Sequence, residues 1–514
     1  MRYARLTGAA LATALCLALA LPDASLWPLA FVAYFPLLLV LPELGSKKAF
    51  LVGWLAGVAA NAAIFHWICH TAMTMSDFPL LPAVLVTLAY ALFSGMSVGV
   101  SATLASHLLA SRASALLVPA AVVSAEWCWP HLFPWQVGNA FFRTPILLQG
   151  MDLTGVNGAT FVAVSFSTAL AALARGRRWA VLPGVLVLVS WLGYGAMRLH
   201  EVRNATPAGV VRLALVQPDI TAEDKKRKDH ANRKALFARL KDLTLSADLS
   251  KVDAVVWPEG AFSYYFALDA QGRQGYEHIL ETSNRLVAMV REANRSLIFG
   301  TLTKPFERAR NSVVMLAPDG SEVARYDKQR LLAFGEYMPL SDLIPGLKHA
   351  VKEVGDMEAG KRAVAFQIGQ AKALISICYE AILAAFTREA LNKTAADLIL
   401  NVTNDAWFGE SGAQAQHLMV QVPRAVELRV PLVRVTQTGI SAVVSPGGDF
   451  LYETAPHERR VDVVEVPFGL DIQSPYRFSG DAFGWLCIAA TILGLRVPLR
   501  HYLRGKKSRS TSTG

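Results

Sequence analysis

The sequence predicts a protein of two parts: a polytopic α-helical membrane domain of about eight transmembrane helices, and a layered α/β domain outside the cytoplasm. Three observations support this prediction. The 514-residue chain is 53% hydrophobic and has a mean hydropathy of +0.34, which is high for a soluble protein. Its apolar residues gather in long runs near the two ends of the chain. Between these runs, β-type and helix-type segments alternate.

Seven apolar segments precede residue 199, and an eighth lies near the end of the chain. Most are long enough to cross a hydrocarbon core about 30 Å thick, although the fifth is short. The segments are 6–21, 27–44, 49–73, 80–109, 115–129, 159–174, 179–197 and 482–499. We therefore expect a membrane domain over residues 1–198, an α/β domain over 199–475, and a final helix with a basic cytoplasmic tail over 476–514.

The positive charges indicate how the chain lies in a membrane. The formal net charge is +10, and this excess lies in residues 1–198 and 476–514, whereas the middle is nearly neutral. That pattern argues against a nucleic-acid partner. Lys and Arg cluster in alternate loops between the apolar segments, so the positive-inside rule places residues 199–475 outside the cytoplasm. The first segment could instead be a cleaved signal, which would leave that domain on the same face.

The middle of the chain alternates between short strand patterns and amphipathic helix patterns. Helices are expected at 222–245, 276–293, 381–391 and 413–429. Strands are expected at 210–217, 253–257, 297–301, 312–317, 322–326, 364–368, 373–377, 397–403, 432–436, 441–445, 450–453 and 461–466. Many strands with fewer, interleaved helices predict sheets covered by helices on the outside.

Only one of the five cysteines, Cys378, lies in the polar middle of the chain. It ends a predicted buried strand where a helix is expected to start, and this setting favours a thiolate and could hold an oxyanion. For a cysteine seen alone, a buried structural residue is the better interpretation. There is no Cys or His spacing typical of a metal site. His66 and His70 share a helical face, and we interpret them as helix–helix hydrogen-bonding residues and expect no metal.

Three predicted strand ends carry residues of the types that acyl transfer requires. Glu259 lies in VVWPEGAF, Lys328 and Glu336 lie in RYDKQRLLAFGEYMPL, and Cys378 lies in ISICYEA. Catalytic groups on several strand ends converge at one rim of a sheet. Singly, each could be a turn residue or a solvated charge. Together they supply a base, a cation and a nucleophile.

These motifs resemble those of the nitrilase, or carbon–nitrogen hydrolase, superfamily and its Glu-Lys-Cys triad. With the apolar segments and NVTNDAWFG at 401–409, nearly the whole chain is similar to the apolipoprotein N-acyltransferases of the bacterial inner membrane. The resemblance implies an α-β-β-α sandwich that faces the periplasm, and no cofactor. It also implies transfer of a fatty acyl chain from a phospholipid, through a Cys thioester, to the N-terminal α-amine of diacylglyceryl-cysteine on an apolipoprotein.

The resemblance implies a role for each residue of the motifs. Glu259 would be the general base, Lys328 the cation that stabilises the tetrahedral oxyanion, and Cys378 the nucleophile that carries the acyl thioester. Glu336, eight residues after Lys328, would orient Lys328 or the substrate amine.

Further residues of the motifs would complete the site. Tyr379 and Glu380 would shape the site behind the nucleophile, and Trp407 and Phe408 match a stretch near the acyl-binding side. One departure from the family pattern concerns the loop after the first strand of the α/β domain. Members carry a tryptophan there, whereas residues 221–228 of this chain read TAEDKKRK.

An apolar segment over residues 331–347 follows Lys328. Its leading apolar residues are Leu331, Leu332 and Phe334. We interpret the segment as a lid that dips toward the bilayer, and the alternative is ordinary packing.

Two other functions compete with acyl transfer. A membrane-tethered amidase would use the same triad, but water would hydrolyse its thioester. A transporter or scaffold would bind without catalysis, and the intact triad and the scarcity of ionisable residues in the apolar segments argue against it. The eight apolar segments and the apolar lid favour lipid substrates over the amidase reaction.

Overall fold

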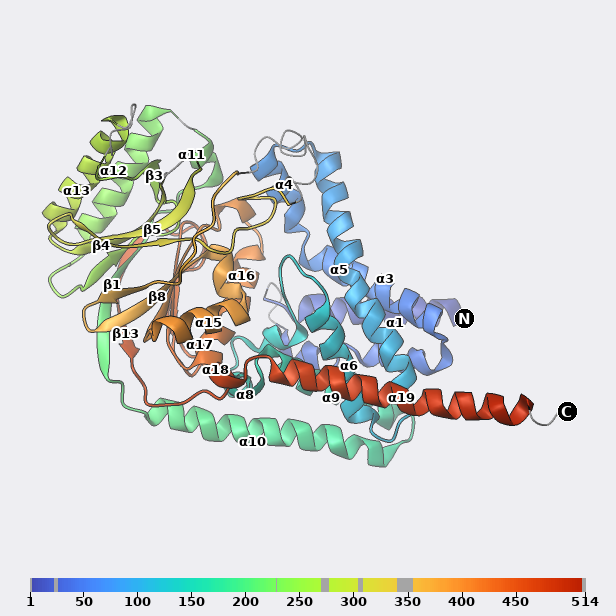
Figure 1. Cartoon of the computed structure of the whole chain (residues 1–514). Coiled ribbons are helices and arrows are strands. Elements are labelled where there is room, and N and C mark those ends of the chain that lie inside the picture. Colours follow the sequence, from blue (N-terminus) through green and yellow to red (C-terminus); the bar gives the residue numbers. More distant parts are fainter. Residues whose placement is uncertain are drawn as a thin grey trace. The chain divides into compact units, whose positions relative to one another are not determined.

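The computed structural model describes residues 2–22, 26–227, 229–269, 277–303, 308–339 and 355–510 (Figure 1). The chain divides into two compact units, which are described separately. The helical unit comprises Met1–Cys69, Leu81–Glu201 and Ser474–Gly514, and the sandwich unit comprises His70–Leu80 and Val202–Gln473. The segment His70–Leu80, which was expected in the membrane domain, groups with the sandwich unit.

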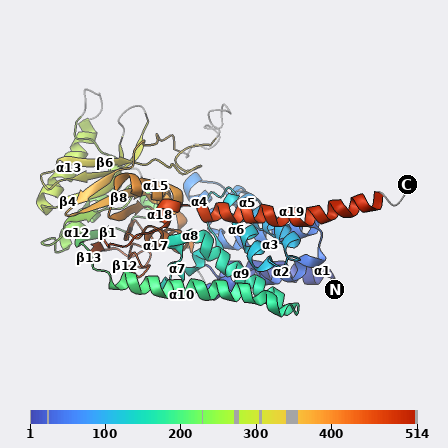
Figure 2. The same ribbon diagram turned by 60° about the horizontal axis from the view of Figure 1, so that its bottom comes forward.

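The helical unit is built from apolar helices joined by short turns. Helix α6 packs against α9 and α19, and α1 packs against α3; Figure 2 shows the first three together. Helices α3 and α5 meet at glycines, since a Cβ on Gly57 would lie 2.4 Å from the Gly95 carbonyl oxygen. The elements are α1 (Arg2–Leu19), η1 (Trp27–Phe31), α2 (Phe35–Val40), η2 (Leu41–Glu43), α3 (Ser46–Ile64), α4 (Trp67–Ser76, shared with the sandwich unit), α5 (Leu80–Leu108), α6 (Ser114–Cys128), η3 (Val137–Phe141), α7 (Pro145–Leu148), α8 (Met151–Thr154), α9 (Val156–Ala174), η4 (Arg178–Val181), α10 (Leu182–Asn204), α18 (Tyr476–Ser479) and α19 (Ala482–Ser510).

Among the described residues, three helices are long and apolar enough to cross a membrane: Leu80–Leu108, Val156–Ala174 and Arg178–Asn204. A fourth is added if Ser46–Ile64 and Trp67–Met75, which are bent by 54°, form one span. Shorter apolar helices are Tyr3–Leu19, Trp27–Glu43, Ser114–Cys128 and Ala482–Arg496. Each expected apolar segment thus holds helix, but the count of eight spans stays a prediction because the described apolar helices of the last group are too short by themselves.

The sandwich unit contains two sheets. One has the order β13-β1-β2-β4-β5-β6, with β3 beside β4, and the other has the order β12-β11-β10-β9-β8-β7. The strands are β1 (Gly209–Gln217), β2 (Ala254–Val256), β3 (Phe262–Tyr265), β4 (Ser296–Thr303), β5 (Arg310–Leu316), β6 (Glu322–Asp327), β7 (Ala365–Ile368), β8 (Ala371–Ile377), β9 (Leu398–Thr403), β10 (Leu432–Thr436), β11 (Ala442–Val444), β12 (Phe450–Glu453) and β13 (Arg460–Phe468).

Helices cover the outer faces of both sheets, in the α-β-β-α order that the resemblance implied. Helices α12 (His230–Ser246) and α13 (Glu277–Ala293) lie outside the first sheet, and α15 (Ala384–Thr394), α16 (Ala413–Gln421) and α17 (Pro423–Leu428) lie outside the second (Figure 1). Short elements complete the unit: α11 (Ala222–Lys226), η5 (Cys378–Ile382) and η6 (Ala406–Phe408).

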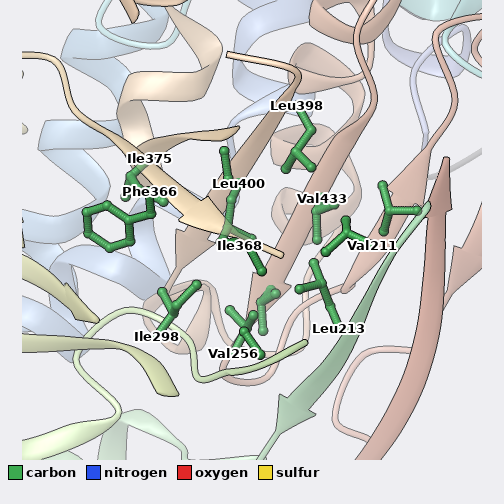
Figure 3. Close-up of a cluster of buried hydrophobic side chains, with 14 of the residues drawn as sticks. Val211, Leu213, Val256, Ile298, Phe366, Ile368, Ile375, Leu398, Leu400 and Val433 are labelled. Carbon is green, nitrogen blue, oxygen red and sulfur yellow. The ribbon is translucent and has the colours of Figure 1, made fainter. Parts of the chain in front are cut away.

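The core lies between the two sheets, because alternate strand residues point to opposite faces. In β1, Val211 and Leu213 face the second sheet, whereas Ala214 and Val216 face α12 and α13. Figure 3 shows the side chains between the sheets, which are fully or almost fully buried: Val211, Leu213, Val256, Ile298, Phe366, Ile368, Ile375, Leu398, Leu400 and Val433. Burial of such side chains stabilises the unit by about 1.5–3 kcal/mol for each large residue. It fixes the strand ends that carry the polar motifs.

Local chemistry changes three of the expected elements. The helix expected at 222–245 is two helices, α11 and α12, because the Asp229 carboxylate accepts a hydrogen bond of 2.8 Å from the Asn232 amide and starts a new helix. The helix expected at 413–429 divides before Pro423, whose ring cannot continue a helical hydrogen-bond ladder. The helix expected at 381–391 begins only at Ala384, since the 3₁₀ turn Cys378–Ile382 comes first.

Candidate active site

The structure brings three of the sequence-predicted charged residues together. Glu259 follows β2, and Lys328 follows β6. The Lys328 ammonium lies 2.8 Å from a Glu336 carboxylate oxygen and 3.6 Å from Glu259 Oε1. Cys378 follows β8. The charges of Glu259 and Lys328 both shift the pKa of its thiol. The base, cation and thiol expected from the motifs therefore share one site of the sandwich unit.

Lys328 is almost completely buried and stays charged. Burial alone lowers the pKa of a lysine, but the carboxylates of Glu336 and Glu259 outweigh it and raise the pKa of Lys328 well above its ordinary value. A fixed ammonium in such a dry setting can stabilise negative charge that develops on a substrate oxygen.

Asn311, which the sequence analysis did not single out, joins the two acidic residues. Its side-chain amide donates to Glu259 Oε1 at 2.7 Å and to Glu336 Oε1 at 2.8 Å. Its backbone carbonyl accepts from the Lys328 amide at 2.9 Å. Asn311 sits inside β5 in an ordinary strand pattern, so its sequence carried no signal of this role.

Cys378 adopts a left-handed backbone conformation, with φ of +50°, at the start of the 3₁₀ turn η5. Such a conformation is uncommon for a residue with a side chain, and strained backbone of this kind clusters at functional sites. The turn takes up the first two residues of the helix that was expected at 381–391.

The expected thiolate is not favoured in the resting structure. Burial and the Glu259 carboxylate raise the pKa of the Cys378 thiol to about 12, and Lys328 opposes this only in part. The prediction that the strand-to-helix setting favours a thiolate was therefore wrong, because the dry surroundings and a nearby anion dominate. The thiol keeps its proton until a base removes it.

Glu380 ties the end of β6 to the end of β8. Its Oε1 accepts hydrogen bonds from Tyr326 Oη and from the amides of Gln329 and Arg330. Its Oε2 accepts from the Ile377 amide at 2.8 Å. The fully buried carboxylate thus holds the segment after Lys328 against the segment before Cys378. Tyr379, between Cys378 and Glu380, is half-buried.

Glu336 closes a tight turn over residues 332–337. Its carboxylate accepts from the Leu332 amide at 2.8 Å and also contacts Lys328. Phe334 forms the tip of this turn with φ of +64° and is 58% exposed, whereas Leu331 and Leu332 are half-buried. The lid expected over 331–347 is therefore described only up to residue 339, and the rest lies outside the described residues.

Trp407 and Phe408 are half-buried in η6, in a turn anchored by the buried Asp405. Asp405 accepts from His417 Nδ1 at 2.9 Å and pairs with Arg434 on its other oxygen. Burial alone raises the pKa of Asp405, but Arg434 and His417 outweigh it and hold the pKa below its ordinary value. The Asp405 carboxylate also raises the pKa of the Cys378 thiol.

Sequence reasoning quoted NVTNDAWFG but did not single out its aspartate or the partners that hold it. In the same turn, Gly409 adopts a φ of +60°, and a Cβ there would lie 2.4 Å from His70 Nε2. Among the described residues, no group of three or more His, Cys, Asp or Glu side chains could hold a metal ion.

Comparisons with known proteins agree with this architecture. The carbon-nitrogen hydrolase family profile matches residues 212–472, and that of the apolipoprotein N-acyltransferase N-terminal domain matches residues 13–169. The apolipoprotein N-acyltransferase of Geobacter metallireducens is 32% identical over 507 residues, covering 92% of this chain and 91% of the relative. That of Rhizobium leguminosarum bv. trifolii is 31% identical over 487 residues, covering 89% and 87%.

Among solved structures, a mutant of the amidase from Nesterenkonia sp. AN1 in complex with butyramide is 19% identical. It covers 55% of this chain and 96% of its own, with a TM-score of 0.39.

The family profile over residues 212–472 shows a carbon–nitrogen hydrolase domain, here carried on a chain with apolar helices. More narrowly, the match over nearly the full length of both chains shows that this chain belongs to the apolipoprotein N-acyltransferase family.

Proposed function

We propose that the chain transfers a fatty acyl group from a glycerophospholipid to the N-terminal α-amine of diacylglyceryl-cysteine on a lipoprotein, through a thioester on Cys378. Family membership supports N-acylation of lipoproteins in general. The observation that carries the finer proposal is the shared site of Glu259, Lys328 and Cys378. Their chemistry is that of a covalent acyl-transfer enzyme that needs no activated cofactor.

In the first half-reaction, Cys378 Sγ attacks the ester carbonyl carbon of the phospholipid while Glu259 takes the thiol proton. Lys328 stabilises the resulting oxyanion. The bond from carbon to the glycerol oxygen then breaks, Glu259 returns the proton to that oxygen, and a lysophospholipid leaves. A base is needed because the high pKa of Cys378 keeps the resting thiol protonated.

In the second half-reaction, the α-amine of the acceptor attacks the thioester carbonyl. Glu259 takes a proton from the amine, the carbon–sulfur bond breaks, and the proton returns to Cys378. The product is an amide, and the thiol is regenerated. Glu336 and Asn311 keep Lys328 and Glu259 in place through both steps, because each contacts one or both of them directly.

We further propose that the apolar helices hold the chain in the bacterial inner membrane, as about eight spans, with the sandwich unit facing the periplasm. The distribution of Lys and Arg supports this orientation. Both substrates are anchored by lipid chains, so a membrane location keeps them at high local concentration. The exposed, apolar tip at Phe334 is the part of the proposed lid that would meet lipid.

The test is intact-protein mass spectrometry of the purified full chain mixed with phosphatidylethanolamine, beside Cys378→Ala. A hydroxylamine-labile gain of one acyl chain on the wild type alone supports the thioester. A diacylated lipopeptide should then discharge it as an amide. Discharge to free fatty acid at an unchanged rate with and without lipopeptide would instead make the chain an amidase-type hydrolase. An absence of any adduct would favour a binding or scaffold role.

A further inference from the structure

Lys225 is a further cation near the site, and neither half-reaction uses it. It lies in α11, directly after β1, where the sequence departs from the family pattern. Its ammonium reaches the turn that carries Glu259, because a Cβ on Gly260 would lie only 3.2 Å from Lys225 Nζ. Gly260 has a φ of +58° and no side chain, so this approach is open.

The short helix α11 is built to hold Lys225 in place. Thr221 and Asp224 cap each other, each side chain accepting a hydrogen bond of 3.2 Å from the other's amide. Asn232 donates to the Asp224 carbonyl oxygen at 2.6 Å, and Arg239 donates to the Asp219 carbonyl oxygen at 2.9 Å. The backbone that carries Lys225 is therefore held by hydrogen bonds at both ends of α11.

Three lysines of this region differ in their partners. Lys328 is buried between two carboxylates, and Lys226 is exposed and pairs with Asp77. Within the described part of the chain, the ammonium of Lys225 makes neither an ion pair nor a hydrogen bond. Lys225 is half-buried, and a cation that is partly withdrawn from water without a partner is costly, so such a group beside a reaction site indicates an anion that arrives with the substrate.

The lowered pKa of Lys225 agrees with the absence of an ion-pair partner among the described residues. Burial lowers the pKa of Lys225 to about 8, although the Glu259 carboxylate opposes the shift. An anionic ligand beside the ammonium would raise the pKa of Lys225 again, so Lys225 would carry its positive charge when the ligand is bound.

We propose that Lys225 binds the phosphate of the glycerophospholipid donor and so places the ester of that donor at Cys378. This inference rests on the proposed function. Of the two proposed substrates, the donor carries a phosphate on the same glycerol as its ester, whatever its head group, whereas the diacylglyceryl-cysteine of the acceptor carries no anion. The acceptor brings an amine, which the Lys225 ammonium would repel when that amine is protonated. Lysine is a common point-charge ligand for phosphate.

The experiment follows thioester formation on the full chain in mixed micelles and uses Lys225→Gln, Lys225→Arg and the matched control Lys226→Gln. The acyl donors are phosphatidylethanolamine, phosphatidylglycerol and a phosphate-free p-nitrophenyl fatty acyl ester. Lys225→Gln should raise KM for both phospholipids about tenfold with kcat little changed, because a charge-assisted hydrogen bond made in the bound ground state is lost. Lys225→Arg should recover most of that loss, and Lys226→Gln should resemble the wild type.

The phosphate-free ester separates binding of phosphate from an effect on Glu259. Acylation by this ester should be the same in Lys225→Gln and the wild type. A fall in kcat with all three donors would overturn the inference, because Lys225 would then act through the base. Equal kinetics of Lys225→Gln and Lys226→Gln would overturn it as well. A wild type that forms no thioester with any donor would overturn the proposed function itself, and with it this inference.

Discussion

At the scale of single residues, the proton of Cys378 governs when the site can react. The buried thiol lies beside the Glu259 carboxylate, and its pKa is raised to about 12. A resting enzyme of this kind is protected from chance alkylation and oxidation, since the thiolate is the reactive form. Under the proposed mechanism, reaction waits for a substrate that brings the carbonyl carbon within reach while Glu259 accepts the proton.

Alkylation by iodoacetamide should report this protonation. Below its pKa a thiol is mostly neutral, so the rate at Cys378 should rise about tenfold per pH unit from about pH 7 to about pH 10 without levelling. The rate is followed by mass spectrometry of the peptide that contains Cys378, with glutathione as the reference thiol. A plateau below about pH 9 would contradict the raised pKa.

Asn311 offers a second test at this scale. In Asn311→Asp, a carboxylate replaces the amide that donates to Glu259 and Glu336, so repulsion replaces two hydrogen bonds. Acyl-thioester formation should fall about 100-fold or more. Ser312→Ala is the control, because it removes a hydrogen bond of 2.7 Å to Asp327 from the next position of β5. A comparable loss in both variants would point to general damage to the strand.

At the scale of elements, hydrophobic periodicity predicted most of the sandwich unit. The expected strand at 432–436 and the one at 450–453 match β10 and β12 in their bounds. The meeting of Glu259 and Lys328 was also predictable, because both follow strands of the first sheet and such strand ends meet at one rim. Cys378 follows β8 of the second sheet, so the expectation of a single sheet was wrong for the thiol. The breaks at Asp229 and before Pro423 were missed because the apolar pattern continues across them. Strand β3 was missed because Phe262–Tyr265 is too short for a clear alternation.

The tertiary partners could not be predicted from local patterns. Asn311, His417 and Arg434 come from three different elements, and only the folded chain shows which carboxylate each one contacts. The same holds for the pKa of Cys378, since burial and the charge of Glu259 depend on the packing of both sheets. The roles carried over from the family resemblance stay predictions until they are measured.

The turn at Phe334 provides the prediction at this scale. Phe334 has a φ of +64°, which favours glycine, so Phe334→Gly should leave stability unchanged or raise it by up to about 1 kcal/mol. If the exposed ring contacts lipid, the same variant should lower turnover of phospholipid in vesicles. The thermal midpoint and the rate of thioester formation are measured together. Unchanged turnover would contradict the lid, and a lower midpoint would contradict the backbone argument.

At the scale of the whole molecule, the expected orientation places exposed residues of the sandwich unit and the loop between α5 and α6 on opposite sides of a membrane. The Lys393 side chain is 73% exposed in the sandwich unit, and Arg112 is exposed between α5 and α6 in the helical unit. Under the positive-inside arrangement, the first faces the periplasm and the second faces the cytoplasm.

Cysteine labelling tests this orientation. In a background without the five native cysteines, Lys393→Cys should react with a membrane-impermeant maleimide in intact spheroplasts. Arg112→Cys should react only after the membrane is permeabilised. The reverse pattern would contradict the orientation, and labelling of both sites in intact cells would contradict a membrane barrier between them.

The pairing of β1 with β13 has a consequence for how such a chain could arise. Gly209, at the start of β1, lies opposite Phe468, at the end of β13. The entry and exit of the sandwich unit are therefore neighbours, about 5 Å apart at their α-carbons. A ready-folded soluble hydrolase with adjacent termini can be spliced between two helices of another protein without spreading them apart.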